Sequence, residues 1–144
     1  MDITGAHTIG VSHCSSVVSR LYNFNSTYPT DPSLDPVYAT KLKASCPNGS
    51  PANNVTTVPM DPNTPNILDN LYYDDVIKNR GLFTSDATLL TNVNTKNLVF
   101  ANSGGFSMRG WQQKFGAAMV KMGKIEVLSG NEGEIRVNCR AVNN

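Results

Sequence analysis

A proline-rich stretch in the middle of the chain limits what this sequence can fold into. Residues 47–66 contain five prolines among many asparagines and threonines. Because proline lacks a backbone N–H and disrupts a helix interior, we predict an extended loop here. A structureless loop of about twenty residues is uncommon in a compact domain, so we expect a bound ion or ligand to order it.

Two helical patterns precede this stretch. Residues 5–21 are predicted to form one helix, because their apolar side chains recur at spacings of three, four and seven. Residues 22–32 are polar and rich in turn-forming residues, which predicts a loop. Asp35 is predicted to cap a second helix, with Pro36 in its first position, that ends at Cys46.

Further helices are predicted after the proline-rich stretch. Asp69 is expected to cap a helix that stops before Gly81, and shorter helices are expected to open near Thr84 and Thr95. The longest helix is expected from about Phe106 to Met122. Its apolar stripe, interpreted as core packing, consists of Met108, Trp111, Phe115, Met119 and Met122. The sequence thus predicts a mainly α fold with long loops.

Charge and hydropathy exclude some functions. Twelve Lys and Arg residues against eleven Asp and Glu give a net charge of +1, and the basic residues form no stripe, so no nucleic-acid partner is expected. No apolar run reaches the ~18 residues that span a bilayer, so no membrane partner is expected. We expect no signal peptide within this sequence, because Met1 and Asp2 lead directly into the histidine segment. A length of 144 residues fits one domain.

The cysteines and the sequons indicate a secreted glycoprotein. Cys14, Cys46 and Cys139 are odd in number, and none lies in a C-x-x-C pair. Three sequons begin at Asn25, Asn48 and Asn54, although Pro51 weakens the second. Clustered sequons are typical of an oxidising, extracellular setting. An unpaired cysteine without a visible signal peptide favours the interpretation that the chain is part of a longer protein.

Both histidines lie in one segment, ITGAHTIGVSHC at residues 3–14. An imidazole near a helix start can bind a metal or haem iron, act as a base, or pack in the core. The residue pattern alone favours the core role for His7. An iron ligand would need a carboxylate behind its ring. Asp86 is a candidate, although no periodicity predicts that it meets His7.

The segment from Asp61 to Asp69 concentrates oxygen ligands. It holds two carboxylates, a threonine hydroxyl and several backbone carbonyls within nine residues. Calcium binds six to eight oxygens, and this segment can supply most of them. The spacing is not that of an EF-hand. The residues alone slightly favour another interpretation, a proline-stiffened turn followed by the helix cap at Asp69.

Taken in order, these motifs resemble the C-terminal half of a plant secretory (class III) haem peroxidase. The matching stretches are GAHTIG at 5–10, DPSL at 31–34, CP at 46–47, DPNTPNILDNLYY at 61–73, GLFTSD at 81–86, FGAAMVKMG at 115–123 and GEIRVNCR at 133–140. The resemblance covers essentially the whole chain. It implies that residues 1–144 form the proximal helical domain of the haem-peroxidase fold, without the N-terminal distal half.

The resemblance also implies a role for each site residue. His7 would bind the iron of haem b, and Asp86 would hold its ring. A proximal calcium site would use Thr8, Asp61, Thr64, the Ile67 carbonyl and Asp69. Cys14 and Cys46 would form a disulfide worth about 3–4 kcal/mol for a loop of roughly thirty residues. Cys139 would pair with a cysteine of the missing half. His13 matches no ligand position.

By this resemblance the protein oxidises phenolic donors with hydrogen peroxide, and it is secreted or vacuolar. Such a role belongs to the oxidative-stress response, peroxide catabolism and cell-wall lignin metabolism. The family's distal motif, R-L-x-F-H-D-C, is absent from this sequence, and Arg20-Leu21-Tyr22 only echoes it. Because general acid–base help is worth about 10²–10⁴-fold, we expect this chain alone to be inactive or very weak.

Two non-enzymatic alternatives stay open. In one, the chain is a truncated pseudo-peroxidase that binds calcium and haem without turnover. In the other, it is a stress-regulated secreted glycoprotein whose fold serves binding. Coding sequence upstream distinguishes the first alternative from an enzyme: an enzyme would encode the distal histidine and arginine there, and a pseudo-peroxidase would not. The second predicts glycosylation without a haem absorption band.

Overall fold

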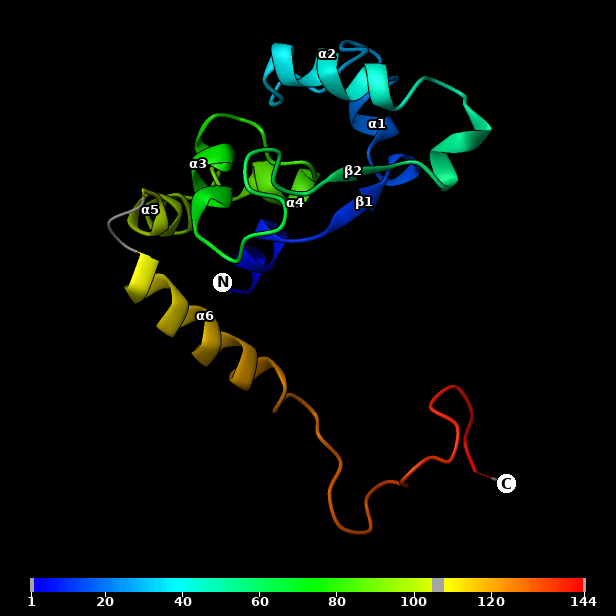
Figure 1. Cartoon of the computed structure of the whole chain (residues 1–144), viewed down its shortest axis with the longest axis vertical. Helices are drawn as coiled ribbons and strands as arrows, with labels where there is room; N and C mark the ends of the chain where they lie inside the picture. Colours follow the sequence, from blue (N-terminus) through cyan, green and yellow to red (C-terminus); the bar gives the residue numbers. More distant parts are fainter. Residues whose placement is uncertain (1, 105–107, 144) are drawn as a thin grey trace.

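The computed structural model describes residues 2–104 and 108–143, and helices dominate it (Figure 1). Its elements are η1 (Asp2–Thr8), β1 (Val11–His13), η2 (Cys14–Ser16), α1 (Val18–Leu21), α2 (Pro36–Ser45), η3 (Pro51–Asn54), β2 (Thr57–Pro59), α3 (Leu71–Ile77), α4 (Thr84–Thr88), α5 (Val93–Asn102) and α6 (Met108–Met122), where η marks a 3₁₀ helix. The predicted mainly α fold with long loops is confirmed.

The single helix predicted over residues 5–21 is wrong. Gly10 adopts a φ of +108°, in a region that favours glycine, and β1 then pairs antiparallel with β2. Because side chains alternate along a strand, Ser12 is buried whereas Val11 is 64% exposed. The predicted helix over residues 5–21 is therefore replaced by four short elements, η1, β1, η2 and α1.

The proline-rich stretch is also more ordered than predicted. It contains η3 and β2, and the side chain of Asn53 donates a hydrogen bond to the Pro47 carbonyl at 2.8 Å. Val58 of β2 is buried in the core. Pairing of β2 with β1 and the burial of Val58 therefore help to order this stretch.

Helix starts are predicted correctly where the signal is local. The Asp35 carboxylate accepts a hydrogen bond from Tyr38 N at 2.8 Å and caps α2, with Pro36 in the first position. The cap of α3 is Asn70 rather than Asp69, although Asp69 accepts from Leu71 N at 2.8 Å.

The start of α5 lies earlier than predicted. The helix begins at Val93, and the Asn92 side chain caps it by accepting from Asn94 N at 2.9 Å. Thr95, predicted to open the helix, instead lies in its first turn, and its hydroxyl donates to the Leu89 carbonyl at 2.6 Å.

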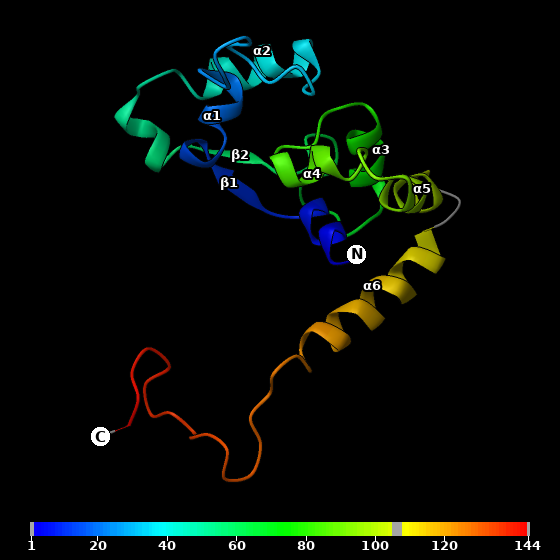
Figure 2. The same ribbon diagram turned by 180° about the vertical axis from the view of Figure 1, so that it is seen from behind.

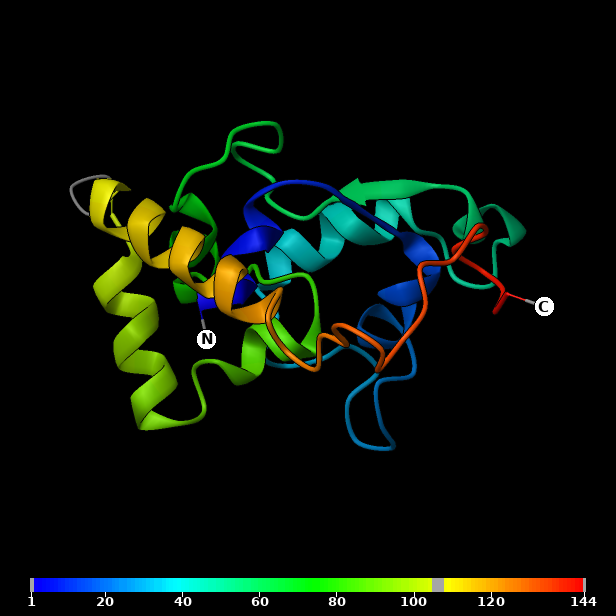
Figure 3. The ribbon, with the colours of Figure 1, turned by 90° about the horizontal axis from the view of Figure 1, so that it is seen from below.

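Two groups of buried side chains form the core. The first surrounds the disulfide and contains Cys14, Val17, Leu21, Leu34, Tyr38, Ala39, Leu42, Cys46, Val58, Met60 and Leu82. The second joins α3, α5 and α6 and contains Tyr72, Tyr73, Val76, Leu89, Val99 and Trp111. Figure 3 shows the elements that carry these two groups side by side.

The prediction for α6 is only partly right. Trp111 is buried and Phe115 stacks on it with ring centroids 5.3 Å apart. Met108, Met119 and Met122 are 38–40% exposed, so most of the stripe is not in the core. The predicted start at Phe106 lies outside the described residues. Figures 1 and 2 show α6 projecting from the body, followed by an extended segment that ends at the C-terminus.

Across residues 2–104 and 108–143, no helix combines the length and the apolar composition needed to cross a membrane.

A buried ion pair lies next to the first core group. Arg20 Nε and Asp31 Oδ2 are 2.7 Å apart, and both residues are 3% exposed. Burial raises the pKa of Asp31, but hydrogen bonds from Ser33 and Arg20 outweigh it and leave the pKa below its ordinary value. Asp31 thus favours the folded state when it is ionised.

This pair predicts a loss of stability in acid. The contribution of Asp31 is fully present above its ordinary pKa of about 3.9 and is lost as the pH falls through the lower folded-state pKa. In urea titrations between about pH 5 and pH 2, we expect the unfolding free energy of Asp31→Asn to depend less on pH than that of wild type. Equal pH dependence in the two proteins would contradict this assignment.

Candidate functional site

The site centres on His7, near the end of η1 and beside Thr8. His7 Nδ1 lies 2.8 Å from Oδ1 of Asp86, a residue that is fully buried in α4. The imidazole contacts the rings of Tyr72 and Phe83 edge to face, with centroids 5.8 and 5.5 Å away. Two segments distant from His7 in sequence, α3 and the segment 83–86, thus fix the orientation of this ring.

The Asp86 carboxylate accepts several hydrogen bonds. Besides His7, its Oδ1 accepts from the Tyr72 hydroxyl at 2.7 Å, and its Oδ2 accepts from the Phe83 backbone N–H at 2.8 Å. Burial and the negative charge of Asp86 raise the pKa of Tyr72 far above its ordinary value, so this hydroxyl stays a donor. Within the described ranges, His7 is the one basic side chain within 4.0 Å of an Asp86 carboxylate oxygen.

This geometry leaves the second ring nitrogen of His7 available. Because a carboxylate can only accept, the proton of the neutral imidazole lies on Nδ1. No hydrogen bond to Nε2 occurs among the residues that the structure describes, and the side chain is 30% exposed. A histidine that donates one N–H to a carboxylate and presents the other nitrogen is suited to bind a metal. The residues present therefore fit a haem iron.

A group of oxygens lies directly beside His7. The Thr8 hydroxyl is within hydrogen-bond distance of the Ile67 carbonyl, at 3.3 Å, and of Asp69 Oδ1, at 3.2 Å. Thr8 and Asp69 are almost entirely buried. The segment that follows the proline-rich stretch therefore meets η1 at Thr8, the residue next to His7 in the chain.

A second group of oxygens surrounds Asp61, which is fully buried. Its Oδ1 accepts from Asn63 N at 2.7 Å and from Thr64 N at 2.9 Å, and its Oδ2 from the Thr64 hydroxyl at 3.2 Å. Ile67 N donates to the Thr64 carbonyl at 3.0 Å. That backbone hydrogen bond links the second group of oxygens to the first.

The buried carboxylates lack cationic partners. In the part of the chain that is described, neither Asp61 nor Asp69 forms an ion pair. Burial, followed by the charge of Asp61, raises the pKa of neighbouring Asp75 to about 6. Since buried carboxylates are costly without a counter-charge, an all-oxygen set of this kind fits a hard cation such as calcium.

Side-chain acids alone do not make this metal site. Among residues 2–104 and 108–143, no three His, Cys, Asp or Glu side chains gather in a way that could hold a metal. A calcium ion here would therefore depend on the threonine hydroxyls and backbone carbonyls as well as on the two aspartates.

The remaining predicted positions are also placed by the structure. Cys14 and Cys46 form a disulfide with a Cα–Cα distance of 5.4 Å, whereas Cys139 is free and exposed. The sequon residues Asn25, Asn48 and Asn54 are exposed. His13 is exposed as well and lies in β1, apart from the His7–Asp86 pair.

Two site residues have no role in the sequence analysis, Tyr72 and Phe83. Tyr72 occurs there only within the matching stretch at 61–73, and its hydroxyl contact with Asp86 leaves no local signal in the sequence. Phe83 takes part through its backbone N–H as well as its ring. A residue pattern cannot indicate a backbone donor of this kind.

Comparison with known proteins places this geometry in context. The family model described as peroxidase matches residues 2–103. The chain is 55% identical over 143 residues to Peroxidase 5 of Vitis vinifera, covering 99% of this chain and 43% of that relative. It is 43% identical to Peroxidase 51 of Arabidopsis thaliana over 143 residues, with coverages of 98% and 42%. It is 42% identical to Peroxidase 1 of Zea mays over 144 residues, with coverages of 98% and 39%. The chain thus spans less than half the length of these relatives and matches their C-terminal portion.

Proposed function

This chain belongs to the peroxidase family, and on that basis we propose that residues 1–144 form the haem-ligating, proximal half of a plant secretory haem peroxidase. One observation carries the proposal: His7 Nδ1 lies 2.8 Å from buried Asp86, which leaves Nε2 for a ligand.

In this proposal His7 would hold the iron of haem b through Nε2. Haem, when bound, supplies the iron that reacts with hydrogen peroxide. Asp86 holds the proton on Nδ1, orients the ring and raises the basicity of the imidazole. Tyr72 and Phe83 restrict the ring from its sides, so His7 meets the iron in one orientation.

The proposed calcium ion would stabilise the same region. Its ligands would be the oxygens of Thr8, Asp61, Thr64, the Ile67 carbonyl and Asp69. A divalent cation there offsets the charge of the two buried aspartates. Because Thr8 follows His7 directly in the chain, the ion would also fix the backbone that carries the iron ligand.

We propose that the whole protein oxidises phenolic donors with hydrogen peroxide, outside the cell or in the vacuole. It would carry glycans at the exposed sequons and take part in the oxidative-stress response and in cell-wall metabolism. The chain spans less than half the length of its relatives. In this proposal the remaining half would carry the proton transfers on the opposite haem face, and it would also pair with Cys139.

Exposed apolar side chains support a covering half. Ile135 and Val137 are each 97% exposed, and Val120 on α6 is 59% exposed. Apolar surface of this extent favours a partner that covers it. The alternative function is a truncated pseudo-peroxidase that binds calcium and haem without turnover.

Haem titration tests the proposal. Added to the oxidised chain in calcium buffer, haemin is expected to give a histidine-ligated absorption spectrum. Because second-shell partners typically change metal affinity 10–100-fold, Asp86→Ala should weaken binding by about that factor, and His7→Ala should abolish the spectrum. His13→Ala is the matched control and should bind as wild type does. Binding that does not change in His7→Ala would overturn the proposal.

The mass of the native protein separates the two functions. A glycan-free, reduced species about twice the 15.6 kDa of this chain is expected for the enzyme, since the curated relatives are more than twice as long. A species of 15.6 kDa that binds haem without peroxidase turnover would support the pseudo-peroxidase instead.

Calcium removal is predicted to destabilise the chain. Ligand binding stabilises the folded state by about 2.7 kcal/mol when the free ligand is at 100 times its Kd, so chelation should lower the unfolding free energy by up to about that amount. Thermal unfolding with calcium and with chelator measures the effect. Thr8→Val should show a smaller difference between the two conditions, and Thr40→Val, an exposed α2 control, the full difference. An identical melting temperature with and without chelator would contradict the calcium site.

A further inference from the structure

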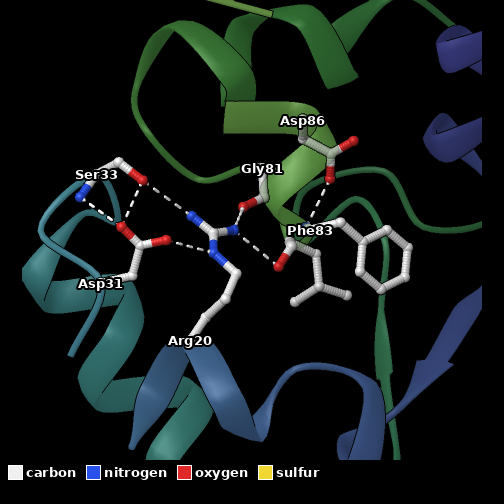
Figure 4. Close-up of polar contacts among 7 residues, drawn as sticks. Arg20, Asp31, Ser33, Gly81, Phe83 and Asp86 are labelled. Atoms are coloured by element: carbon white, nitrogen blue, oxygen red, sulfur yellow. Dashed lines mark hydrogen bonds and ion pairs between the residues drawn. The ribbon is translucent and has the colours of Figure 1, made fainter. Parts of the chain in front are cut away.

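Arg20 of α1 is buried in a polar network that the proposed ligand sets do not use. Its Nε donates to Asp31 Oδ2 at 2.7 Å, and its Nη2 to Ser33 Oγ at 3.2 Å (Figure 4). Ser33 in turn donates to Asp31 Oδ1 from its backbone N, at 2.8 Å, and from its hydroxyl, at 2.6 Å. Asp31 and Ser33 therefore fix the plane of the guanidinium group.

The other edge of the guanidinium group holds a distant turn. Arg20 Nη1 donates to the carbonyls of Gly81, at 2.7 Å, and Leu82, at 2.9 Å. These residues connect α3 to α4 and belong to neither helix. The arginine thus supplies the partners that regular secondary structure does not give these two carbonyls.

One peptide group connects this clamp to Asp86. The Leu82 carbonyl and the Phe83 N–H belong to the same planar peptide unit. Arg20 binds the carbonyl end, and the N–H end donates to Asp86 Oδ2 at 2.8 Å. Figure 4 shows Arg20 and Asp86 on opposite sides of this turn. Hydrogen bonds in such a chain polarise and strengthen one another.

A steric contact couples the turn to Asp86 a second time. A Cβ placed on Gly81 would lie 2.5 Å from the Asp86 Cβ. The turn therefore packs directly on the base of the Asp86 side chain. A shift of the Gly81 backbone toward Asp86 would therefore displace the Asp86 side chain.

We propose that Arg20 is a positioning residue for the His7–Asp86 pair: by holding the Leu82–Phe83 peptide, it keeps Asp86 Oδ1 directed at His7 Nδ1. The effect of Arg20 on an iron ligand rests on the proposed function, whereas the contacts of Arg20 do not depend on it. Without Arg20, two carbonyls lose their donors and the turn relaxes. Asp86 then loses the fixed N–H that holds Oδ2, and its side chain can rotate away from His7.

The tautomer of His7 provides a test that needs no haem. Long-range ¹H–¹⁵N spectra of the labelled, calcium-loaded chain distinguish the two tautomers at about pH 8.5, well above the ordinary histidine pKa of about 6.5. Wild type should show the Nδ1–H form. In Arg20→Met, we expect the Nε2–H population to rise by roughly tenfold, because the oriented charge-assisted hydrogen bond is lost. Arg20→Lys, which keeps the charge but not the fork, should lie between.

Arg80→Met is the matched control. Arg80 precedes the same turn and forms a looser ion pair with Asp35 at 3.9 Å. This variant should keep the wild-type tautomer. If Arg20→Met folds and melts at a lower temperature while the His7 tautomer is unchanged, Arg20 only supports the fold and the proposal is wrong. If Arg20→Met does not fold, Arg20→Lys decides by the same criterion, together with faster hydrogen exchange at the Phe83 amide.

A haem measurement separates this proposal from the proposed function. In the ferrous haem complex, the iron–histidine stretching frequency should be lower in Arg20→Met than in wild type and unchanged in Arg80→Met. A wild-type chain that binds no haem through His7 would overturn the proposed function. The tautomer result would still decide the role of Arg20.

Discussion

Replacing Trp111 with alanine is expected to cost about 3–5 kcal/mol of unfolding free energy, as is usual for a large buried aromatic residue. Trp111 is 1% exposed and stacks on Phe115. Its Nε1 donates to the Tyr73 hydroxyl at 3.4 Å. The same nitrogen would lie 3.0 Å from a Cβ placed on Gly5, so the indole fills the space between α6 and η1.

The expected structural result is that α6 separates from the body. Urea unfolding followed by circular dichroism measures the loss of stability, and limited proteolysis within 108–122 reports the release of α6. Met119→Ala is the control, because Met119 is on the same helix and 38% exposed; surface changes typically stay within about 0.5 kcal/mol. A Trp111→Ala loss no larger than this would show that α6 is not held by its indole.

Removing the Cys14–Cys46 disulfide is expected to have a similarly large effect. The bond joins residues 32 apart in sequence, and both cysteines are fully buried. In the chain-entropy model a loop of about this length is worth about 3–4 kcal/mol. At roughly 3 °C per kcal/mol for a chain of this size, the double variant Cys14→Ala/Cys46→Ala should melt about 10 °C lower.

The free cysteine supplies the control for this experiment. Cys139 is exposed and unbonded, so Cys139→Ser should melt as wild type does and also prevents disulfide exchange. Measuring the double variant in this background isolates the contribution of the single bond. If the Cys14→Ala/Cys46→Ala chain keeps its melting temperature, other contacts of the first core group hold α1 and α2 together without it.

Local signals predicted the elements that local contacts determine. Asp35 followed by Pro36 predicted the start of α2, because the cap and its N–H partner lie three residues apart. The helix predicted over residues 5–21 failed for the opposite reason. The structure of this segment depends on the positive φ of Gly10 and on pairing with β2, which lies more than forty residues after Gly10. In α6, periodicity predicted the helix but not which part of its apolar stripe has a partner.

The site shows the same limit. His7 and Asp86 are 79 residues apart, so no periodicity could bring them together, and only the resemblance to a family paired them. Arg20 was interpreted as part of a chance echo of another motif. Its partners are backbone carbonyls 61 and 62 residues away, and carbonyls carry no residue identity that a motif search can detect.

The Leu82–Phe83 peptide has a consequence for protein engineering. A designer who transplants only the His7 and Asp86 side chains into a new scaffold would omit the amide that holds the carboxylate from behind. The transplant would also need a turn with glycine at the position of Gly81, where a side chain would collide with the acid. A transplant would therefore have to include the backbone of the turn at 81–83 and an arginine in the place of Arg20. The two side chains alone would not reproduce the arrangement.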